Sequence, residues 1–197
     1  DPDNDGVHDL KPLLLDVYRP EDVGSAQVPA VILVHGGGFT EGSKEQEEIV
    51  RFAEYFASRG YVALSINYRL TADRPPSPPG WNVTNLTRTT HAAMVDVRAA
   101  VRFVRANATD LNVNPDRIGL LGESAGAIAA VSTAMADPPL FTDDGENFPQ
   151  PAGNSLEASS KVQAYVHFWG NADHVLIAMD RDDPPTMIVH GTDDDQF

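Results

Sequence analysis

A serine stands between two glycines where a strand-like sequence changes into a helix-like one. The pentapeptide is Gly122-Glu123-Ser124-Ala125-Gly126, preceded by the apolar run 118–121 and followed by the small residues 127–131. A G-x-S-x-G sequence in this setting favours a sharp strand-to-helix turn that strains the serine backbone and exposes its hydroxyl. Glycines on either side leave room where the strand and the helix approach each other. Ser124 is therefore the leading candidate for a nucleophile, with an ordinary glycine turn as the alternative.

Apolar runs alternate with amphipathic stretches along most of the chain. Runs typical of buried strands lie at 30–34, 61–66, 118–121, 162–168 and 186–190, and 13–18 has the pattern of an edge strand stopped by Pro20. Helical periodicity lies between these runs, at 43–60 and at 94–108. Strands that alternate with helices predict an α/β fold with a mostly parallel, doubly wound sheet.

Two details of the expected helices can be read from their spacing. Ser43 and Gln46 have the separation of a capping box at the start of the first helix. The second helix carries Arg98, Arg102 and Arg105 opposite its apolar stripe. We expect this arginine face to be solvated, as charged helix faces usually are.

Two long segments interrupt the alternation. Residues 71–87 and 137–160 are rich in loop-forming residues and longer than most connections. They are candidates for shaping a substrate mouth, with plain surface insertions as the alternative. Trp81 and Trp169 are candidates for lining an acyl or aryl pocket, although core packing is the simpler expectation.

Composition restricts the partners of this chain. Its length of 197 residues predicts a single domain (13–197) after an acidic N-terminal segment (1–12). The chain is 42% hydrophobic and carries a net charge of −15. The negative charge disfavours nucleic acid and anionic membranes, and no apolar run approaches the roughly 20 residues that span a bilayer. The chain has no cysteine, which excludes disulfides and thiolate chemistry. Localisation and homo-oligomer formation are left open.

The N-terminal segment has the spacing of an incomplete cation loop. Asp1, Asp3 and Asp5 are followed by Gly6, as at the start of a calcium-binding loop. Pro12 occupies the position of the closing glutamate. We therefore favour a solvated linker and expect neither a metal nor a cofactor.

A second motif follows the first buried strand. It reads His35-Gly36-Gly37-Gly38-Phe39, and a glycine-rich turn at this point exposes backbone N–H groups that can stabilise a negative oxygen. A tight turn or a phosphate loop is the alternative, but the spacings of phosphate loops are absent. We expect His35 to hold the loop by hydrogen bonding rather than to act as a base.

A third motif follows the last strand. His190-Gly191-Thr192 is followed by three aspartates, 193–195. A carboxylate just beyond the carboxyl end of a strand is well placed to orient a histidine. A solvated acidic turn explains the same residues equally well.

These motifs, together with Asn67-Tyr68-Arg69-Leu70 and Pro115-Asp116-Arg117-Ile118, resemble the α/β-hydrolase superfamily of serine esterases and lipases. The resemblance is to the hormone-sensitive-lipase-like and feruloyl/acetyl-esterase-like carboxylesterases, and it runs from about Leu13 to the C-terminus. It implies an α/β-hydrolase fold that hydrolyses carboxylic esters through a serine acyl-enzyme. The implied substrates are small short-chain acyl or aryl esters, with acylated carbohydrates among them. A peptidase of the same fold and a catalytically impaired binding protein are the alternatives.

The resemblance also implies roles for individual residues. Ser124 would be the nucleophile and Asp194 the acid, with Asp193 and Asp195 adjoining it. The oxyanion hole would consist of the backbone N–H groups of Gly37, Gly38 and Ala125.

The catalytic histidine does not have its family position. In the family it follows the acid after a further strand, whereas His167, His174 and His190 all precede Asp194. We favour a natural protein that continues beyond the chain, with the C-terminal strand, the histidine and a helix missing here. A second chain, or an internal histidine such as His167 or His174, is the next explanation. A degenerate hydrolase is the third.

Overall fold

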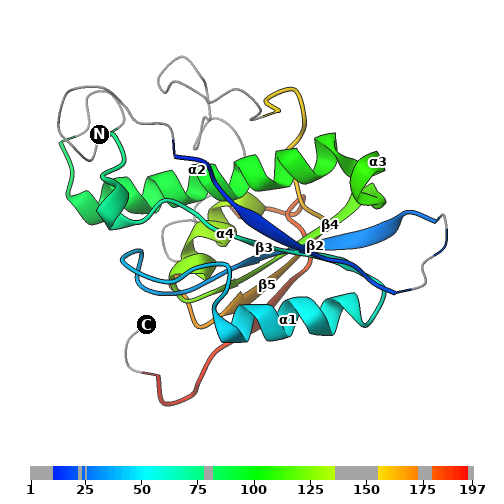
Figure 1. The fold of residues 1–197 in the computed structure, drawn as a ribbon. Coiled ribbons are helices and arrows are strands. Elements are labelled where there is room, and N and C mark those ends of the chain that lie inside the picture. The colour runs from blue at the N-terminus through cyan, green and yellow to red at the C-terminus, as the bar shows by residue number, and fades with distance from the viewer. Residues whose placement is uncertain are drawn as a thin grey trace.

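The computed structural model describes residues 11–21, 24, 26–77, 82–135, 155–172 and 179–194. In these residues a six-stranded sheet carries α1 on one face and α2 and α4 on the other (Figure 1). The strands are β1 (Leu15–Tyr18), β2 (Val28–Val34), β3 (Val62–Ile66), β4 (Val113–Glu123), β5 (Ala164–Phe168) and β6 (Thr186–Val189). The helices are α1 (Glu47–Ala57), the 3-10 turn η1 (Thr71–Asp73), α2 (Asn85–Ala106), α3 (Ala108–Leu111) and α4 (Ala125–Met135).

The sheet has the order β1-β3-β2-β4-β5-β6. Among the described strands only β1 is antiparallel, and it pairs with β3 at one edge. The other described strands are parallel to their neighbours, so the expected α/β class with a mostly parallel, doubly wound sheet is confirmed. Because parallel strands end at the same edge, the loops after β2, β4, β5 and β6 lie along one edge of the sheet, where ligands bind in open α/β sheets.

Two apolar cores hold the layers together, one on each face of the sheet. Along β2, Ile32 and Val34 belong to the core under α2 and α4, whereas Val31 and Leu33 belong to the core under α1. Successive strand residues point to opposite faces, so a strand covered on both sides needs apolar residues without interruption. This explains the continuous apolar run that predicted it.

The start of α1 differs from the prediction. Gln46 is the N-cap residue and no side chain caps the helix, so the predicted capping box is wrong. The Ser43 hydroxyl donates to the Glu45 carboxylate instead. The Gln46 side-chain amide donates to the carboxylate of Glu123, a residue distant in the chain.

The arginine face of α2 also differs from the prediction. Arg98 and Arg102 are only 5% and 3% exposed, so the expected solvated face is wrong. The segment after residue 155 packs on it: Arg105 donates to the carbonyl oxygen of Lys161 (2.6 Å), and Arg98 Nε donates to the Ser160 hydroxyl (3.4 Å). Irregular backbone needs partners for its polar groups, and these guanidinium groups supply donors.

Several sequence expectations fall on residues outside the described part of the chain. The calcium-like segment 1–9, Trp81, His174 and Asp195 are among them. Within the described residues, no helix combines the length and the apolar character required to cross a bilayer.

Candidate active site

Ser124 is the single residue between the end of β4 and the start of α4. Its φ is +50°, a left-handed conformation that costs a residue with a Cβ about 1–2 kcal/mol. Its N–H donates to the carbonyl oxygen of Phe168 (2.9 Å), and its own carbonyl accepts from the N–H of Ile128 (3.1 Å). The side chain is partly exposed. The turn thus presents the serine at the carboxyl edge of the sheet with a fixed backbone.

The two glycines of the motif allow this turn to form. A Cβ at Gly122 would lie 2.5 Å from the carbonyl oxygen of Gly126, and one at Gly126 would lie 2.3 Å from the carbonyl oxygen of Val34. Real Cβ atoms do not approach backbone so closely. The first turn of α4 therefore rests directly on β4 and on the end of β2.

The glycine loop (residues 36–39) follows β2 and lies against Ser124. A Cβ at Gly36 would be 3.2 Å from the Cβ of Ser124. Three consecutive residues then have positive φ: Gly37 (109°), Gly38 (60°) and Phe39 (63°). The Gly37 carbonyl closes the turn by accepting from the N–H of Thr40 (3.0 Å). The structure therefore brings the start of this loop beside the strand-to-helix turn of residues 122–126, the serine elbow. Ala125 is the first helical residue of this elbow.

His35 and Tyr68 fix the base of the loop. The buried His35 ring stacks on Tyr68 with 4.3 Å between centroids. His35 Nδ1 donates to the Gly36 carbonyl (2.7 Å), and the Tyr68 hydroxyl donates to the His35 carbonyl (3.0 Å). Burial lowers the pKa of His35, which favours the neutral ring. The expectation that His35 holds the loop by hydrogen bonding is confirmed.

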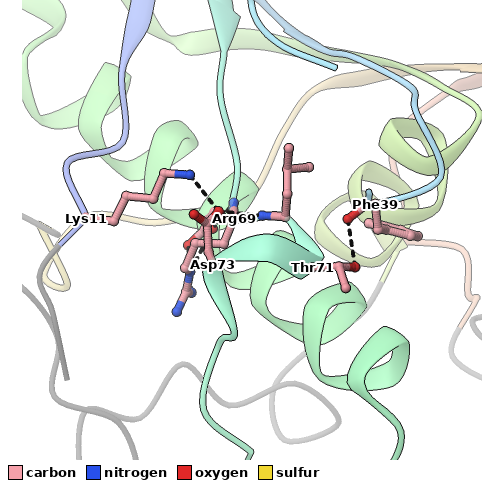
Figure 2. Close-up of polar contacts among 7 residues, drawn as sticks. Lys11, Phe39, Arg69, Thr71 and Asp73 are labelled. Carbon is pink, nitrogen blue, oxygen red and sulfur yellow. Dashed lines mark hydrogen bonds and ion pairs between the residues drawn. The ribbon is translucent and has the colours of Figure 1, made fainter. Parts of the chain in front are cut away.

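Phe39 anchors the far side of the loop. Its ring is 5% exposed, and its carbonyl accepts from both the N–H (2.8 Å) and the hydroxyl (3.0 Å) of Thr71 (Figure 2). Asp73, at the other end of η1, accepts from the N–H of Leu70 (2.8 Å) and forms an ion pair with Lys11. The turn η1 is thus tied to the loop at one end and to the N-terminal segment at the other.

Arg69, which precedes η1 in the chain, connects this region to α2. Its guanidinium makes a two-pronged contact with Asp96, with Nε at 2.9 Å from Oδ2 and Nη2 at 2.7 Å from Oδ1. Asp96 is only 4% exposed and also accepts from the Arg69 backbone N–H (2.8 Å). Asn67 adds an acceptor for the Lys44 N–H (2.7 Å). The Asn-Tyr-Arg-Leu motif is therefore the scaffold behind the glycine loop.

Asp194 lies after β6 and is paired with a histidine. Its Oδ2 is 3.5 Å from Nε2 of His190, and both side chains are partly exposed. Its N–H lies 3.4 Å from the Gly191 carbonyl oxygen, which closes the turn between them. His190 thus lies next to Asp194, although it comes before it in the chain.

Both ring nitrogens of His167 contact other groups of the fold. Its ring is 3% exposed, with Nδ1 2.7 Å from the Tyr165 hydroxyl and Nε2 facing the backbone of Gly170. Since the Tyr165 hydroxyl donates to the carbonyl of Ala127 (2.8 Å), Nδ1 must be the donor to Tyr165. Burial lowers the pKa of His167, and nearby His190 lowers it further. Among the described residues, no histidine ring forms a hydrogen bond with the Ser124 hydroxyl.

Trp169 was expected to pack in the core, but it is 39% exposed, so that expectation is wrong. Its indole stacks on Phe168, which in turn stacks on Phe52, with 5.3 and 5.4 Å between centroids. Its φ of +34° is unusual for an aromatic residue, and its N–H is held by the Val189 carbonyl (2.9 Å). Because the Phe168 carbonyl binds Ser124, this aromatic surface lies close to the elbow.

A cavity of about 480 Å³ opens beside the glycine loop. It is lined by Gly37, Glu41, Gly42, Ser43, Glu45 and Gln46. The sequence did not predict this cavity, because it depends on how the loop between β2 and α1 folds back on itself.

Comparison with known proteins identifies the family. The BD-FAE family model matches residues 15–180, and the chain belongs to this family. The chain is 32% identical over 137 residues to gut esterase 1 of Caenorhabditis briggsae, which covers 67% of the chain and 22% of that protein. It is 31% identical over 162 residues to esterase LipQ of Mycobacterium tuberculosis, covering 81% of the chain and 32% of LipQ.

A solved structure shows the same fold. The esterase Est2 of Thermogutta terrifontis, with propionate bound, superposes with a TM-score of 0.70 at 26% identity, covering 93% of the chain and 68% of Est2. The α/β-hydrolase resemblance expected from the motifs is thus confirmed. The chain spans about a fifth to a third of the length of the two curated relatives.

Proposed function

We propose that this chain is part of a carboxylic ester hydrolase that works through a serine acyl-enzyme. The observation that carries the proposal is the placement of Ser124, which is partly exposed, has a φ of +50° and has the glycine loop against it. Membership of the BD-FAE family and the esterases among its relatives support the same activity.

In the proposed reaction the Ser124 oxygen attacks the ester carbonyl carbon. The new serine C–O bond replaces the ester C–O bond, and the alcohol leaves with the serine proton. Water then hydrolyses the acyl-enzyme, which releases the acid and restores the serine hydroxyl. We propose that the N–H groups of Gly37, Gly38 and Ala125 hold the oxyanion. Positive φ at both glycines and the unsatisfied N–H groups at a helix start support this assignment.

Asp194 is the proposed acid that orients the catalytic histidine. Its position beyond the carboxyl end of β6 supports this role. The turn 191–194 keeps the carboxylate partly exposed, where a second histidine has access to it. His167 is not our candidate for the base because both of its ring nitrogens face other groups of the fold.

The proposed substrates are short-chain acyl or aryl esters, acylated carbohydrates among them. The exposed indole of Trp169 offers an aromatic surface near the elbow. The carboxylates of Glu41 and Glu45 beside the cavity offer acceptors for the hydroxyls of a carbohydrate. The net charge of −15 supports a small ester, rather than nucleic acid or an anionic membrane, as the partner.

Hydrolysis of p-nitrophenyl acetate tests the proposal. We expect turnover by the protein that contains this chain, and a loss of about 10⁴-fold or more in kcat for Ser124→Ala, as for other serine nucleophiles. Ser58→Ala is the matched control, because Ser58 is exposed at the end of α1 and its hydroxyl donates to the Tyr55 carbonyl, far from the elbow in the chain. Turnover that survives in Ser124→Ala would contradict the proposal.

A hydrolase-fold binding protein without turnover is the second candidate. It is favoured by one observation: among the described residues, the Ser124 hydroxyl has no histidine partner. A serine without a base is a weak nucleophile. Absence of turnover together with tight binding of an ester or its acid product would select this candidate. Cleavage of a nitroanilide peptide in preference to esters would select a peptidase.

A further inference from the structure

Glu123, the residue before the serine, joins three segments of the chain through one carboxylate oxygen. Its Oε1 accepts from the backbone N–H of Gly36 (3.2 Å) and from Nε2 of Gln46 (3.1 Å). Gly36 begins the glycine loop, Gln46 precedes α1, and Glu123 itself ends β4. The carboxylate is 4% exposed. A buried acceptor with two donors from elsewhere in the chain is a specific contact rather than a solvated charge.

Gly36 is held from both sides. Its N–H is bound by Glu123, and its carbonyl oxygen accepts from His35 Nδ1 (2.7 Å), with the Tyr68 hydroxyl at 3.3 Å. A Cβ on Gly36 would be 3.2 Å from the Ser124 Cβ. Movement of Gly36 therefore changes both the spacing to the nucleophile and the direction of the next peptide unit, whose N–H belongs to Gly37.

The orientation of Gln46 depends on Glu123. Its Oε1 is buried and has no hydrogen-bond partner among the described residues, which costs about 1–3 kcal/mol for an isolated buried acceptor. The reverse orientation of the amide would place Oε1 against Glu123 Oε1, acceptor against acceptor. The contact with Glu123 therefore determines which way the amide points.

We propose that Glu123 is a positioning residue that holds the glycine loop at a fixed distance from Ser124. This inference rests on the proposed function, because it assigns Glu123 to the same site. Glu123 touches no reacting atom in this scheme. It acts through the Gly36 peptide, which keeps the N–H groups of Gly37 and Gly38 at a fixed distance from the serine oxygen. Oxyanion donors are effective only when they are held in place before the reaction.

Three variants test the inference. Glu123→Ala removes the acceptor, Glu123→Gln keeps an oxygen that can accept from Gly36, and Gln46→Met removes only the second donor. Glu54→Ala on the exposed face of α1 is the matched glutamate control. For p-nitrophenyl acetate we expect Glu123→Ala to lose about 10- to 100-fold in kcat, in the range below deletion of an oxyanion donor, with KM changed less than threefold. We expect Glu123→Gln to retain kcat within about fivefold, Gln46→Met to lose less than Glu123→Ala, and Glu54→Ala to match the parent.

A second readout does not depend on turnover. Amide hydrogen exchange at Gly36 reports the bond to Glu123 directly, and we expect it to accelerate at least tenfold in Glu123→Ala but not in Glu123→Gln. Ser124→Ala separates the two proposals, because it abolishes turnover without changing exchange at Gly36. Wild-type kcat in Glu123→Ala, or equal losses in Glu123→Ala and Glu123→Gln, would overturn the positioning role. Unchanged exchange at Gly36 in Glu123→Ala would overturn it even if the parent chain hydrolyses no ester.

Discussion

Gly126→Ala probes the packing of the serine elbow most sharply. A Cβ at this position would lie 2.3 Å from the Val34 carbonyl oxygen and 2.4 Å from that of His35. Both are backbone atoms at the end of β2, so they cannot rotate away as a flexible side chain does. Overpacking typically costs about 1–3 kcal/mol, and more where backbone must move. We expect the free energy of unfolding to fall by about 3 kcal/mol, equivalent to a Tm roughly 6–12 °C lower in a domain of this size.

Substitutions at two other glycines distinguish the cost of a steric clash from the cost of backbone strain. Gly119 lies on β4, and a Cβ there would be 3.5 Å from its nearest neighbour, an ordinary contact. Gly119→Ala should change the free energy of unfolding by less than about 1 kcal/mol. Gly60 has a φ of +85° and no atom within 4 Å of its virtual Cβ, so Gly60→Ala should cost about 1–2 kcal/mol from conformation alone.

Urea unfolding followed by circular dichroism measures all three variants. The expected order of stability is Gly119→Ala, then Gly60→Ala, then Gly126→Ala. If Gly126→Ala matches Gly119→Ala, α4 does not rest on the end of β2. The close approach of the glycine loop to Ser124 would then lose its physical basis.

Three further predictions concern the surroundings of the site. Asp96→Asn should cost about 1.5–3 kcal/mol, because it removes the charge from a buried carboxylate that accepts hydrogen bonds from the partly exposed Arg69 guanidinium; a urea midpoint within error of the parent would refute this. Burial raises the pKa of Glu123, so the folded chain holds a proton that the unfolded chain has lost, and stability falls as pH rises from about 4.3 through the raised value. Glu123→Gln should flatten this pH dependence of the free energy of unfolding, and parallel profiles would contradict it. Trp169→Ala should lower kcat/KM for aryl esters several-fold more than for methyl esters, since it removes the exposed indole near the elbow; equal losses would exclude substrate contact.

Local sequence patterns were sufficient to predict the layers of the fold. The uninterrupted apolar run of β2 predicted a strand covered on both faces, and the structure buries its Ile32 and Leu33 in opposite cores. The same reasoning held for the elbow, because glycines at 122 and 126 are required wherever a strand and a helix meet so closely. These features depend on neighbours in sequence, which a single chain displays directly.

Features that depend on distant partners could not be predicted. Gln46 has the spacing of a helix cap, but its amide binds Glu123, 77 residues later. Arg98 has the periodicity of a solvated face, but Ser160, 62 residues later, covers it. Trp169 has the apolar character of a core residue, but its backbone N–H is held by the Val189 carbonyl of β6 and its side chain is exposed. In each case tertiary contacts override the local preference.

Labelling with a fluorophosphonate tests the central claim, that Ser124 is a nucleophile presented at the elbow. Intact-mass and peptide mass spectrometry of the folded protein that contains this chain should show one phosphonyl adduct, located on the peptide that contains Ser124. Ser124→Ala should show none, and Ser58→Ala should label like the parent. A folded parent protein that carries no adduct, or an adduct on another residue, would contradict the account.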